Sequence, residues 1–197
     1  MSGKSQAVFL DRDGVINIDR ADFVRSWQEF EFAPRALEAL AVLSQTPYKI
    51  VVITNQSGVG RGLLTQGTLD EMHARMMDRV RASGGRIDAI YYCPHAPSAG
   101  CECRKPAPGL FVAAAKDLAI SLASSWAIGD RVRDAEAAHR AGVPAILLDR
   151  TLPDDSGVPT SPLQFVRAAD LFAAVRIILD RSIEPCEAVR HKPPEDN

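Results

Sequence analysis

The sequence predicts an α/β fold in which helices cover both faces of a parallel sheet. Five short apolar runs, rich in β-branched residues, alternate with stretches of helical periodicity. Polar, often glycine-containing segments follow these runs, as in open parallel sheets that bind ligands at the carboxyl ends of their strands. The 197 residues fit one domain, which we assign to residues 1–184. The polar, proline-rich residues 185–197 are expected to form a disordered tail.

The expected elements alternate along the chain. Strands are expected at residues 7–10, 49–54, 87–93, 126–128 and 145–148. Helices are expected at residues 34–43, with a proline near the start, at 68–80, after a capping-box sequence at Thr68, and at 110–118, 134–141 and 168–179. Gly142 is expected to end the fourth helix, and residues 151–161 are expected to form a surface loop.

Composition and charge disfavour several classes of function. With 46% hydrophobic and 24% charged residues, the chain has the composition of an ordinary globular protein. Its net charge of -2 provides no basic field to attract nucleic acid or anionic lipid. No apolar run approaches the ~20 residues of a membrane span, and the first residues lack a signal-peptide pattern. We therefore expect a cytoplasmic protein that binds neither nucleic acid nor membrane, with a monomer as the default state.

Residues suited to phosphate and metal chemistry follow the first two strands. Asp11 and Asp13 stand at a glycine-containing turn that can direct both carboxylates toward one ligand, and they repel each other unless a cation such as Mg²⁺ lies between them. The alternative is a strand end with two solvated aspartates, which are common in turns. The second strand ends at Thr54, before a glycine-rich segment at residues 55–62. Such a segment can cradle a phosphate, although a glycine-rich turn alone is a weak indication.

Charged residues also follow the third and fourth strands. Arg104 and Lys105 precede a proline, cannot continue a helix and can be presented together to a phosphate. The alternative is a solvated basic pair. The fourth strand leads into Asp130 and then Asp134. Asp134 serves either as the N-cap of the next helix or as a supporting residue of a site.

Together these segments resemble the four signature motifs of the haloacid-dehalogenase-like (HAD-like) phosphohydrolases. The resemblance covers residues 8–148 and depends on Asp11-x-Asp13, Thr54, Lys105 and Gly129-Asp130-x-x-x-Asp134, each at a strand end and in that order. It implies a Rossmann-like sheet. The sequence leaves no room for a separate cap domain, so residues 19–32 and a cysteine-containing loop at 93–103 are expected to exclude water from the site.

The resemblance implies a Mg²⁺-dependent phosphoric monoester hydrolase. Asp11 would be the nucleophile that forms an aspartyl-phosphate, and Asp13 the general acid and base. Mg²⁺ would bind Asp11, the backbone carbonyl of Asp13, and Asp130. Thr54 and Lys105 would hold the transferring phosphoryl oxygens.

Three of the four cysteines share one short segment with a histidine. The four ligands that this segment offers are Cys93, His95, Cys101 and Cys103. Three thiolates and one imidazole suit tetrahedral Zn²⁺, although the spacing departs from the commoner C-x-x-C knuckle. A closed shell of four ligands leaves no position for substrate, so the zinc is predicted to be structural and to fold the loop that presents Arg104 and Lys105. We assign no role to Cys186, which is expected to be a free thiol.

Asp-x-Asp phosphatases with such a zinc loop resemble two groups, the D-glycero-D-manno-heptose 1,7-bisphosphate phosphatases and the histidinol-phosphate phosphatases. Ser57 favours the first group, because the second more often has an acid there. The first group removes the 7-phosphate in the pathway to the heptose of lipopolysaccharide. The resemblance implies substrate contacts from Asp19, Asp22, Asn55, Gln56, Ser57, Arg104 and Arg131. The chain departs from the heptose group at residues 20–24 and at Arg131, where lysine is common, and this leaves the preferred anomer open.

Other functions remain as alternatives. A histidinol-phosphate phosphatase is separable by substrate preference. A polynucleotide 3′-phosphatase or a zinc-knuckle binding module is disfavoured, because the net charge is -2 and the sequence lacks an aromatic and basic patch. A catalytically silent relative is disfavoured because every residue that the chemistry needs is present.

Overall fold

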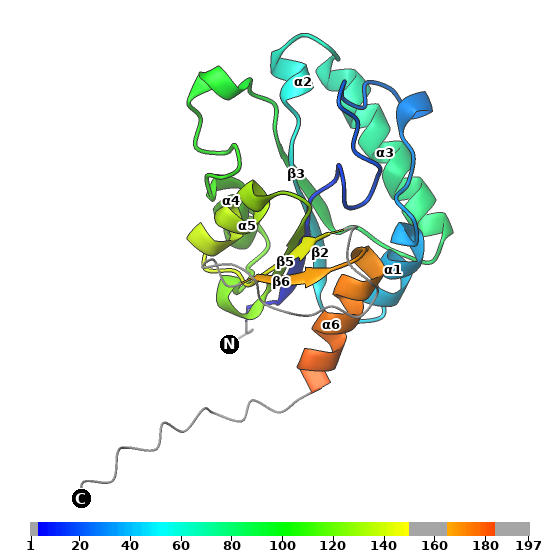
Figure 1. Cartoon of the computed structure of the whole chain (residues 1–197), viewed down its shortest axis with the longest axis vertical. Helices are drawn as coiled ribbons and strands as arrows, with labels where there is room; N and C mark the ends of the chain where they lie inside the picture. Colours follow the sequence, from blue (N-terminus) through cyan, green and yellow to red (C-terminus); the bar gives the residue numbers. More distant parts are fainter. Residues whose placement is uncertain (1–3, 150–164, 184–197) are drawn as a thin grey trace, which may run out of the picture.

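Six parallel strands form one sheet in the order β3-β2-β1-β4-β5-β6 (Figure 1). The computed structural model describes residues 4–149 and 165–183. The strands are β1 (Ala7–Leu10), β2 (Lys49–Asn55), β3 (Ala89–Cys93), β4 (Trp126–Gly129), β5 (Ala145–Leu148) and β6 (Phe165–Ala168). This arrangement confirms the Rossmann-like α/β fold. The sequence predicted five strands and missed β6, because four residues with an arginine among them carry too weak a pattern.

Helices cover both faces of the sheet (Figure 1). One face is covered by α1 (Ala36–Leu43), α3 (Gln66–Ala82) and α6 (Leu171–Ile183). The other face is covered by α4 (Gly109–Asp117) and α5 (Val132–Arg140). The shorter helices are α2 (Ser57–Gly60), η1 (Trp27–Glu29), η2 (Pro97–Ala99) and η3 (Leu122–Ser124). Within the described ranges, no helix has the length and hydropathy needed to cross a membrane.

The central strand β1 is buried on both faces. Val8 and Leu10 join the core under α1, α3 and α6, whereas Ala7 and Phe9 join the core under α4 and α5. The Phe9 ring meets the Phe111 ring of α4 edge to face, with centroids 5.0 Å apart. Burial on both sides explains the uninterrupted apolar sequence, which is typical of parallel sheets.

The strand register brings the ends of three strands together. Leu10 pairs with Val52 of β2 on one side and with Ile128 of β4 on the other. Since the strands are parallel, the residues that follow each of them lie at the same edge of the sheet. The polar segments identified in the sequence are therefore neighbours in space.

Two helix starts differ from the sequence-based expectation. The α3 helix begins at Gln66, because the Thr65 hydroxyl accepts a hydrogen bond from the Thr68 N–H at 3.0 Å. The prediction of Thr68 as the capping residue was wrong. The N-cap of α5 is Arg131, whose backbone N–H donates to Asp134 Oδ2 at 3.0 Å. Asp134 is therefore not the N-cap, and it stabilises the helix start from inside the first turn.

Other boundaries agree with expectation to within a few residues. Gly142 has a φ of 74° and ends α5, as predicted. The loop expected at residues 151–161, the tail at 185–197 and Cys186 lie outside the described residues, so the expectations for them and for the domain boundary remain predictions.

Candidate active site

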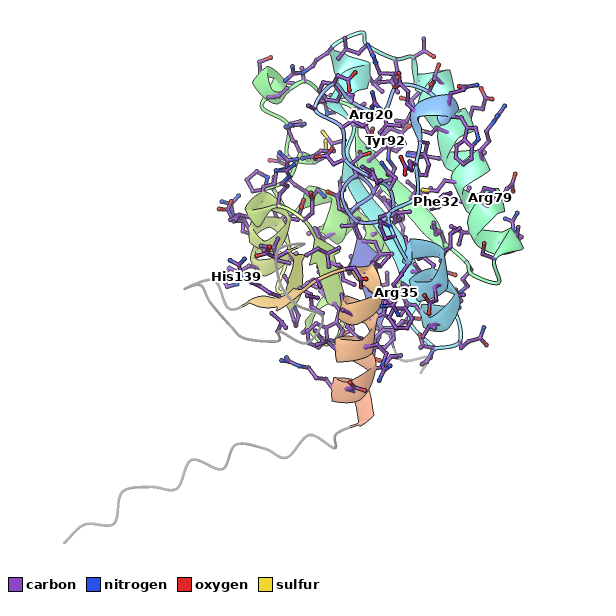
Figure 2. The ribbon with its side chains drawn as sticks, turned by 45° about the vertical axis from the view of Figure 1, so that its right-hand side comes forward. Arg20, Phe32, Arg35, Arg79, Tyr92 and His139 are labelled. Carbon is purple, nitrogen blue, oxygen red and sulfur yellow. The ribbon has the colours of Figure 1, made fainter. Side chains whose placement is uncertain are left out.

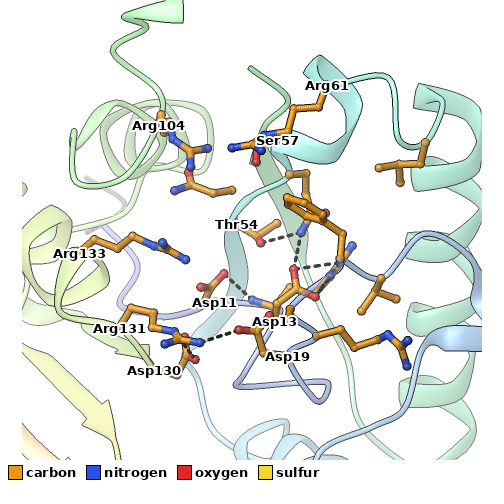
Figure 3. A pocket seen from close by; sticks show the side chains of 18 residues that line it. Asp11, Asp13, Asp19, Thr54, Ser57, Arg61, Arg104, Asp130, Arg131 and Arg133 are labelled. Atoms are coloured by element: carbon orange, nitrogen blue, oxygen red, sulfur yellow. Dashed lines mark hydrogen bonds and ion pairs between the residues drawn. The ribbon is translucent and has the colours of Figure 1, made fainter. Parts of the chain in front are cut away.

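A cavity of about 380 Å³ opens at the carboxyl ends of β1, β2 and β4 (Figure 3). Acidic groups lie at its base, among them Asp11 and Asp13 after β1 and Asp130 after β4. Six arginines also line it, namely Arg12, Arg20, Arg61, Arg104, Arg131 and Arg133. A cavity with this lining suits a ligand that carries several negative charges, bound together with a cation.

Most of the expected substrate contacts line the cavity. Those that do are Asp19, Asn55, Gln56, Ser57, Arg104 and Arg131. Asp22 does not, because it is exposed and pairs with Arg20 at 3.3 Å and Arg25 at 3.2 Å. Arg61 and Arg133 also line the cavity, although the sequence did not predict a substrate contact for either of them. Their positions inside the glycine-rich segment and the Asp130 motif were the signals that could have identified them.

Lys105 is held between two carboxylates beneath the cavity. Its Nζ lies 2.9 Å from Asp11 Oδ2 and 2.7 Å from Asp134 Oδ1, and it donates to the Ile53 carbonyl at 2.9 Å. Burial opposes the charged form, but the charges of Asp11 and Asp134 outweigh it and raise the pKa of Lys105. The ammonium group is thus a fixed positive charge beside Asp11. Asp134 thus contacts this lysine as well as the backbone at the start of α5.

Three carboxylates form a cluster that fits a divalent cation. Asp11, Asp130 and Asp134 each offer an oxygen within 4.8 Å of the others. Burial raises the pKa of Asp11 to about 7 and that of Asp130 to about 6. Gly14 has a φ of 82°, and a Cβ there would lie 2.2 Å from Asp130 Oδ2. The turn at Gly14 therefore packs the backbone after β1 against Asp130. Several carboxylate oxygens this close together are ligands that suit Mg²⁺.

Asp13 is oriented by donors on both of its oxygens. Arg12 Nη2 lies 2.8 Å from Oδ1 and 3.0 Å from Oδ2 of this carboxylate. Asn17 donates to Oδ1 at 2.9 Å, and Gln56 donates to Oδ2 at 2.7 Å. Burial tends to raise the pKa of Asp13, but Arg12 and these hydrogen bonds bring it below its ordinary value. The sequence did not predict a role for Arg12 or Asn17. Their position next to Asp11 and Asp13 in the chain was the only feature of the sequence that pointed to one.

Hydrogen bonds within the protein engage the side chains at the end of β2 and directly after it. The Thr54 hydroxyl accepts a hydrogen bond from Gln56 Nε2 at 3.0 Å (Figure 3). The Asn55 side chain exchanges two hydrogen bonds of 3.1 Å with the backbone of Lys105. Asn55 thus ties the lysine segment to β2. Ser57 lies at the start of α2, facing the cavity.

The cysteines and histidine of the loop at residues 93–103 converge on one point. The four side chains offer ligand atoms within 4.8 Å of one another. Cys93 Sγ lies 3.5 Å from Cys101 Sγ, and His95 Nδ1 lies 3.2 Å from Cys103 Sγ. All three cysteines are free. The donor set fits Zn²⁺, since thiolate and imidazole are the ligands of structural zinc sites.

This loop also contacts α2 and the residue before it. The Cys93 carbonyl accepts from the Gln56 N–H at 2.8 Å, and the Pro94 carbonyl accepts from the Gly60 N–H at 2.8 Å. A Cβ at Gly60 would lie 2.6 Å from the Pro94 oxygen and 2.6 Å from the Ala96 nitrogen. The loop and α2 are therefore packed backbone against backbone.

An ion pair connects two segments at the cavity mouth. Arg131 Nη2 lies 2.8 Å from Asp19 Oδ2, and Arg131 Nε lies 3.2 Å from Asp130 Oδ2 (Figure 3). Arg131 thus bridges the segment after β1 and the acid after β4. The loop at residues 19–32 is held near the site in this way.

The chain is similar to proteins of one family over most of its length. A HAD-hydrolase-like family matches residues 102–156. A D-glycero-beta-D-manno-heptose-1,7-bisphosphate 7-phosphatase of Pseudomonas putida is 40% identical over 177 residues, which cover 87% of this chain and 98% of that protein. A protein of the same name from Escherichia coli is 37% identical over 169 residues, which cover 82% of this chain and 86% of that protein.

Solved structures show the same likeness. The crystal structure of D,D-heptose 1.7-bisphosphate phosphatase from B. bronchiseptica, complexed with magnesium and phosphate, matches with a TM-score of 0.81 and 38% identity. The match covers 89% of this chain and 99% of that one. The equivalent phosphatase from Burkholderia thailandensis matches with a TM-score of 0.63 and 32% identity, over 91% of this chain and 99% of that one.

Proposed function

The chain belongs to the D-glycero-beta-D-manno-heptose-1,7-bisphosphate 7-phosphatases, a family of HAD-like fold, and we propose that it removes the 7-phosphate of D-glycero-D-manno-heptose 1,7-bisphosphate. It is a phosphoric monoester hydrolase, as the sequence predicted. The observation that best supports the substrate is the arginine-lined cavity in front of Asp11. Such a cavity suits a sugar that carries a second phosphate, and this reaction would belong to the pathway to the heptose of lipopolysaccharide.

In the proposed mechanism Asp11 attacks the phosphorus of the 7-phosphate. A carboxylate oxygen of Asp11 forms a bond to phosphorus while the bond from phosphorus to the C7 oxygen breaks. Asp13 gives a proton to the departing oxygen. A water molecule then attacks the phosphorus of the aspartyl-phosphate, Asp13 takes its proton, and Asp11 is released together with inorganic phosphate.

The protonation of Asp13 changes during this cycle. Arg12, Asn17 and Gln56 hold Asp13 as an anion in the free protein, which is the form that takes a proton from water. Phosphoryl oxygens close to Asp13 would raise its pKa by repulsion between like charges. We therefore propose that Asp13 gains the proton it donates when the substrate binds.

Lys105 and Thr54 are proposed to hold the transferring phosphoryl oxygens. Lys105 is already fixed between Asp11 and Asp134, and Thr54 lies on the neighbouring strand end. Asp11, the Asp13 carbonyl and Asp130 would hold Mg²⁺, which would supply the positive charge that lets a phosphate dianion approach these carboxylates. Positioned charge is the main contribution of a protein to phosphoryl transfer.

The retained 1-phosphate is proposed to meet the arginines of the cavity. Arg104 Nη1 is buried and lacks a hydrogen-bond partner among the described residues. A buried donor without a partner is unfavourable, and a phosphate oxygen would satisfy it. Arg131 and Arg133 also line the cavity and add positive charge (Figure 3). The cationic amine of histidinol phosphate would be repelled by this lining, which disfavours that alternative.

A structural zinc ion is proposed in the loop at residues 93–103, where it would supply a cross-link among four ligands. The sequence-based expectations of a monomeric cytoplasmic protein that binds neither nucleic acid nor membrane stay part of the proposal.

The proposal is tested by phosphate release with Mg²⁺ from heptose 1,7-bisphosphate and from histidinol phosphate, measured in parallel. We expect kcat/KM to favour the heptose bisphosphate by about a hundredfold, near 2.7 kcal/mol of differential transition-state binding. Asp11→Asn, which keeps the shape of the side chain, should abolish turnover. A preference for histidinol phosphate, or appreciable activity of Asp11→Asn, would contradict the substrate or the nucleophile assignment respectively.

A further inference from the structure

Arg12 is buried although it carries a charge. Its side chain is 1% exposed. The Nε and Nη2 atoms face the Asp13 carboxylate, with Nε 3.3 Å and Nη2 2.8 Å from Oδ1. The guanidinium carbon lies 5.9 Å from the centre of the Phe30 ring. A buried guanidinium needs partners for its N–H groups, and the carboxylate engages only one side of it.

The partner on the other side is His73 of α3. Arg12 Nη1 lies 3.3 Å from His73 Nε2, and His73 is 5% exposed. Arginine only donates hydrogen bonds, so Nε2 must accept and the ring proton must stand on Nδ1. The contact therefore requires a neutral imidazole of one tautomer.

The surroundings of His73 favour that neutral form. The charged and titratable groups around it are Arg12, Asp13 and Asp70, and the Tyr92 ring lies 5.6 Å away, centre to centre. Burial, and after it the charge of Arg12, lowers the pKa of His73 to about 4. Tyr92 stands beside α3 in Figure 2, with its hydroxyl 3.4 Å from Asp70 Oδ1.

We propose that His73 is a positioning residue for the reaction, and that it acts by fixing Arg12 against both oxygens of the Asp13 carboxylate. The inference rests on the proposed acid–base role of Asp13. Without an acceptor at His73 Nε2, the Nη1 donor of Arg12 loses its partner and the guanidinium can turn or admit water. Asp13 would then keep the single hydrogen bonds from Asn17 and Gln56 but lose the planar, two-point contact that sets its orientation.

The competing explanation is that His73 only fills space in the core beneath α3. Its neighbours on the buried side of this helix are apolar, among them Leu69, Met76 and Val80. A space-filling role predicts that a leucine of similar volume serves equally well. A positioning role predicts that only a side chain with an acceptor at the same place does.

The test compares His73→Leu with His73→Gln in the full chain with Mg²⁺ and heptose 1,7-bisphosphate. Glutamine can place an oxygen near the position of Nε2. We expect His73→Leu to lower kcat about tenfold with KM changed less than twofold, because orienting groups around a reactive centre typically contribute at that level. His73→Gln should restore at least half of the wild-type kcat.

Two controls separate this effect from folding. Val80→Ala removes volume from the same buried face of α3, two turns away, and should lower the melting temperature without changing kcat. His139→Leu replaces an exposed histidine on α5 and should change neither (Figure 2). Wild-type kcat in His73→Leu, or a loss that His73→Gln does not restore, overturns the proposal.

The tautomer of His73 gives a readout that does not depend on activity. In ¹⁵N-labelled protein at pH 7, NMR should show the proton on Nδ1 and an unprotonated Nε2. A proton on Nε2 overturns the proposed contact whatever the kinetics. An Asp13→Asn variant with wild-type kcat would instead overturn the acid–base role of Asp13, and the inference with it. An inactive Asp13→Asn beside a fully active His73→Leu overturns only the role of His73.

Discussion

At the scale of single residues, charge compensation organises the site. Asp11 and Asp134 are buried and lie on the two sides of one lysine, and the partly buried Asp13 pairs with a buried arginine. Charges without partners are costly to bury, so each group constrains the position of the next. Two consequences can be tested on single side chains.

Arg104 is expected to recognise the retained phosphate. Arg104→Gln should lower kcat/KM for heptose 1,7-bisphosphate by about ten- to a hundredfold, because a hydrogen bond to a charged group contributes roughly 1.5–3 kcal/mol. The same variant should hydrolyse p-nitrophenyl phosphate, which has no second phosphate, at a rate close to wild type. Steady-state kinetics on both substrates check this. Equal losses on the two substrates would place Arg104 with the transferring phosphoryl group instead.

His73 is expected to make stability depend on pH. Burial in the folded protein lowers its pKa from 6.5 to about 4. Between pH 6.5 and pH 4, the unfolded chain therefore binds a proton at this residue that the folded chain does not bind. Stability from this residue is complete above pH 6.5 and is lost as the pH falls toward 4. At about 1.4 kcal/mol per pKa unit the loss is about 3 kcal/mol. Urea unfolding of wild type and His73→Gln at pH 7 and pH 4.5 should show a smaller decrease in the variant; parallel decreases would contradict the assignment.

At the scale of elements, the loop at residues 93–103 connects three parts of the site. It leads into Lys105, it bonds to the backbone of Gln56 and Gly60, and it carries the proposed zinc ligands. The loop has no regular structure except the short η2 helix, so its shape depends on cross-links and backbone contacts. Changes in the loop should therefore reach the catalytic groups.

Removal of zinc is expected to weaken catalysis without removing any catalytic group. Chelation followed by dialysis into excess Mg²⁺ should lower kcat/KM at least about tenfold and speed proteolysis within the loop, since structural zinc contributes directly to folding. Adding Zn²⁺ back should restore both properties. Unchanged kinetics in a sample that is free of zinc by elemental analysis would refute the role of the metal in positioning Lys105.

Gly60 is expected to tolerate no side chain. A Cβ there would lie 2.6 Å from two backbone atoms of the loop, so Gly60→Ala should separate α2 from the loop, reducing kcat/KM and the melting temperature. The matched control is Gly67→Ala in α3, where the nearest atom would be 3.9 Å away and alanine should stabilise by about 0.5–1 kcal/mol. Enzyme assays and thermal melts of both variants check the contrast. Similar kcat/KM values and melting temperatures of the two variants would show that the loop at residues 93–103 can move to accommodate the added methyl group.

At the scale of the whole molecule, the site lies at the carboxyl ends of the central strands of the sheet. Asp11 and Asp130 follow β1 and β4, Thr54 lies near the end of the adjacent β2, and helices on both faces hold these strands in place. Binding at this edge therefore contacts segments that are far apart in the chain. Ligands that bind only when the strands are assembled stabilise the folded molecule as a unit.

Mg²⁺ is accordingly expected to raise the melting temperature. At a concentration about a hundred times its Kd, a ligand specific for the folded state adds about 2.7 kcal/mol to the free energy of unfolding. Asp130→Asn should abolish most of the increase, whereas Asp78→Asn, an exposed acid on α3, should leave it unchanged. Thermal melts with and without Mg²⁺ measure this directly. An equal increase in all three proteins would indicate binding away from the proposed cluster.

The order of the strands along the chain and the residue types at their ends could be predicted from the sequence. Uninterrupted apolar runs such as residues 7–10 have to be buried on both faces, and parallel strands put their carboxyl ends at one edge. These two arguments were sufficient to predict that Asp11, Thr54, Lys105 and Asp130 lie close together. The convergence of the cysteines and histidine was also predictable, because their separations along the chain are short.

Only the tertiary structure decided which side chains compensate one another. Arg12 contacts His73, which lies on a helix 61 positions further along the chain. The Asn55 side chain forms hydrogen bonds with the backbone of Lys105, 50 positions away. The sixth strand likewise depends on pairing with β5 rather than on its own sequence. The physical reason is that local patterns encode burial and backbone conformation. The rotation and height of a helix against a sheet, which determine contacts between distant side chains, arise only when the whole core packs.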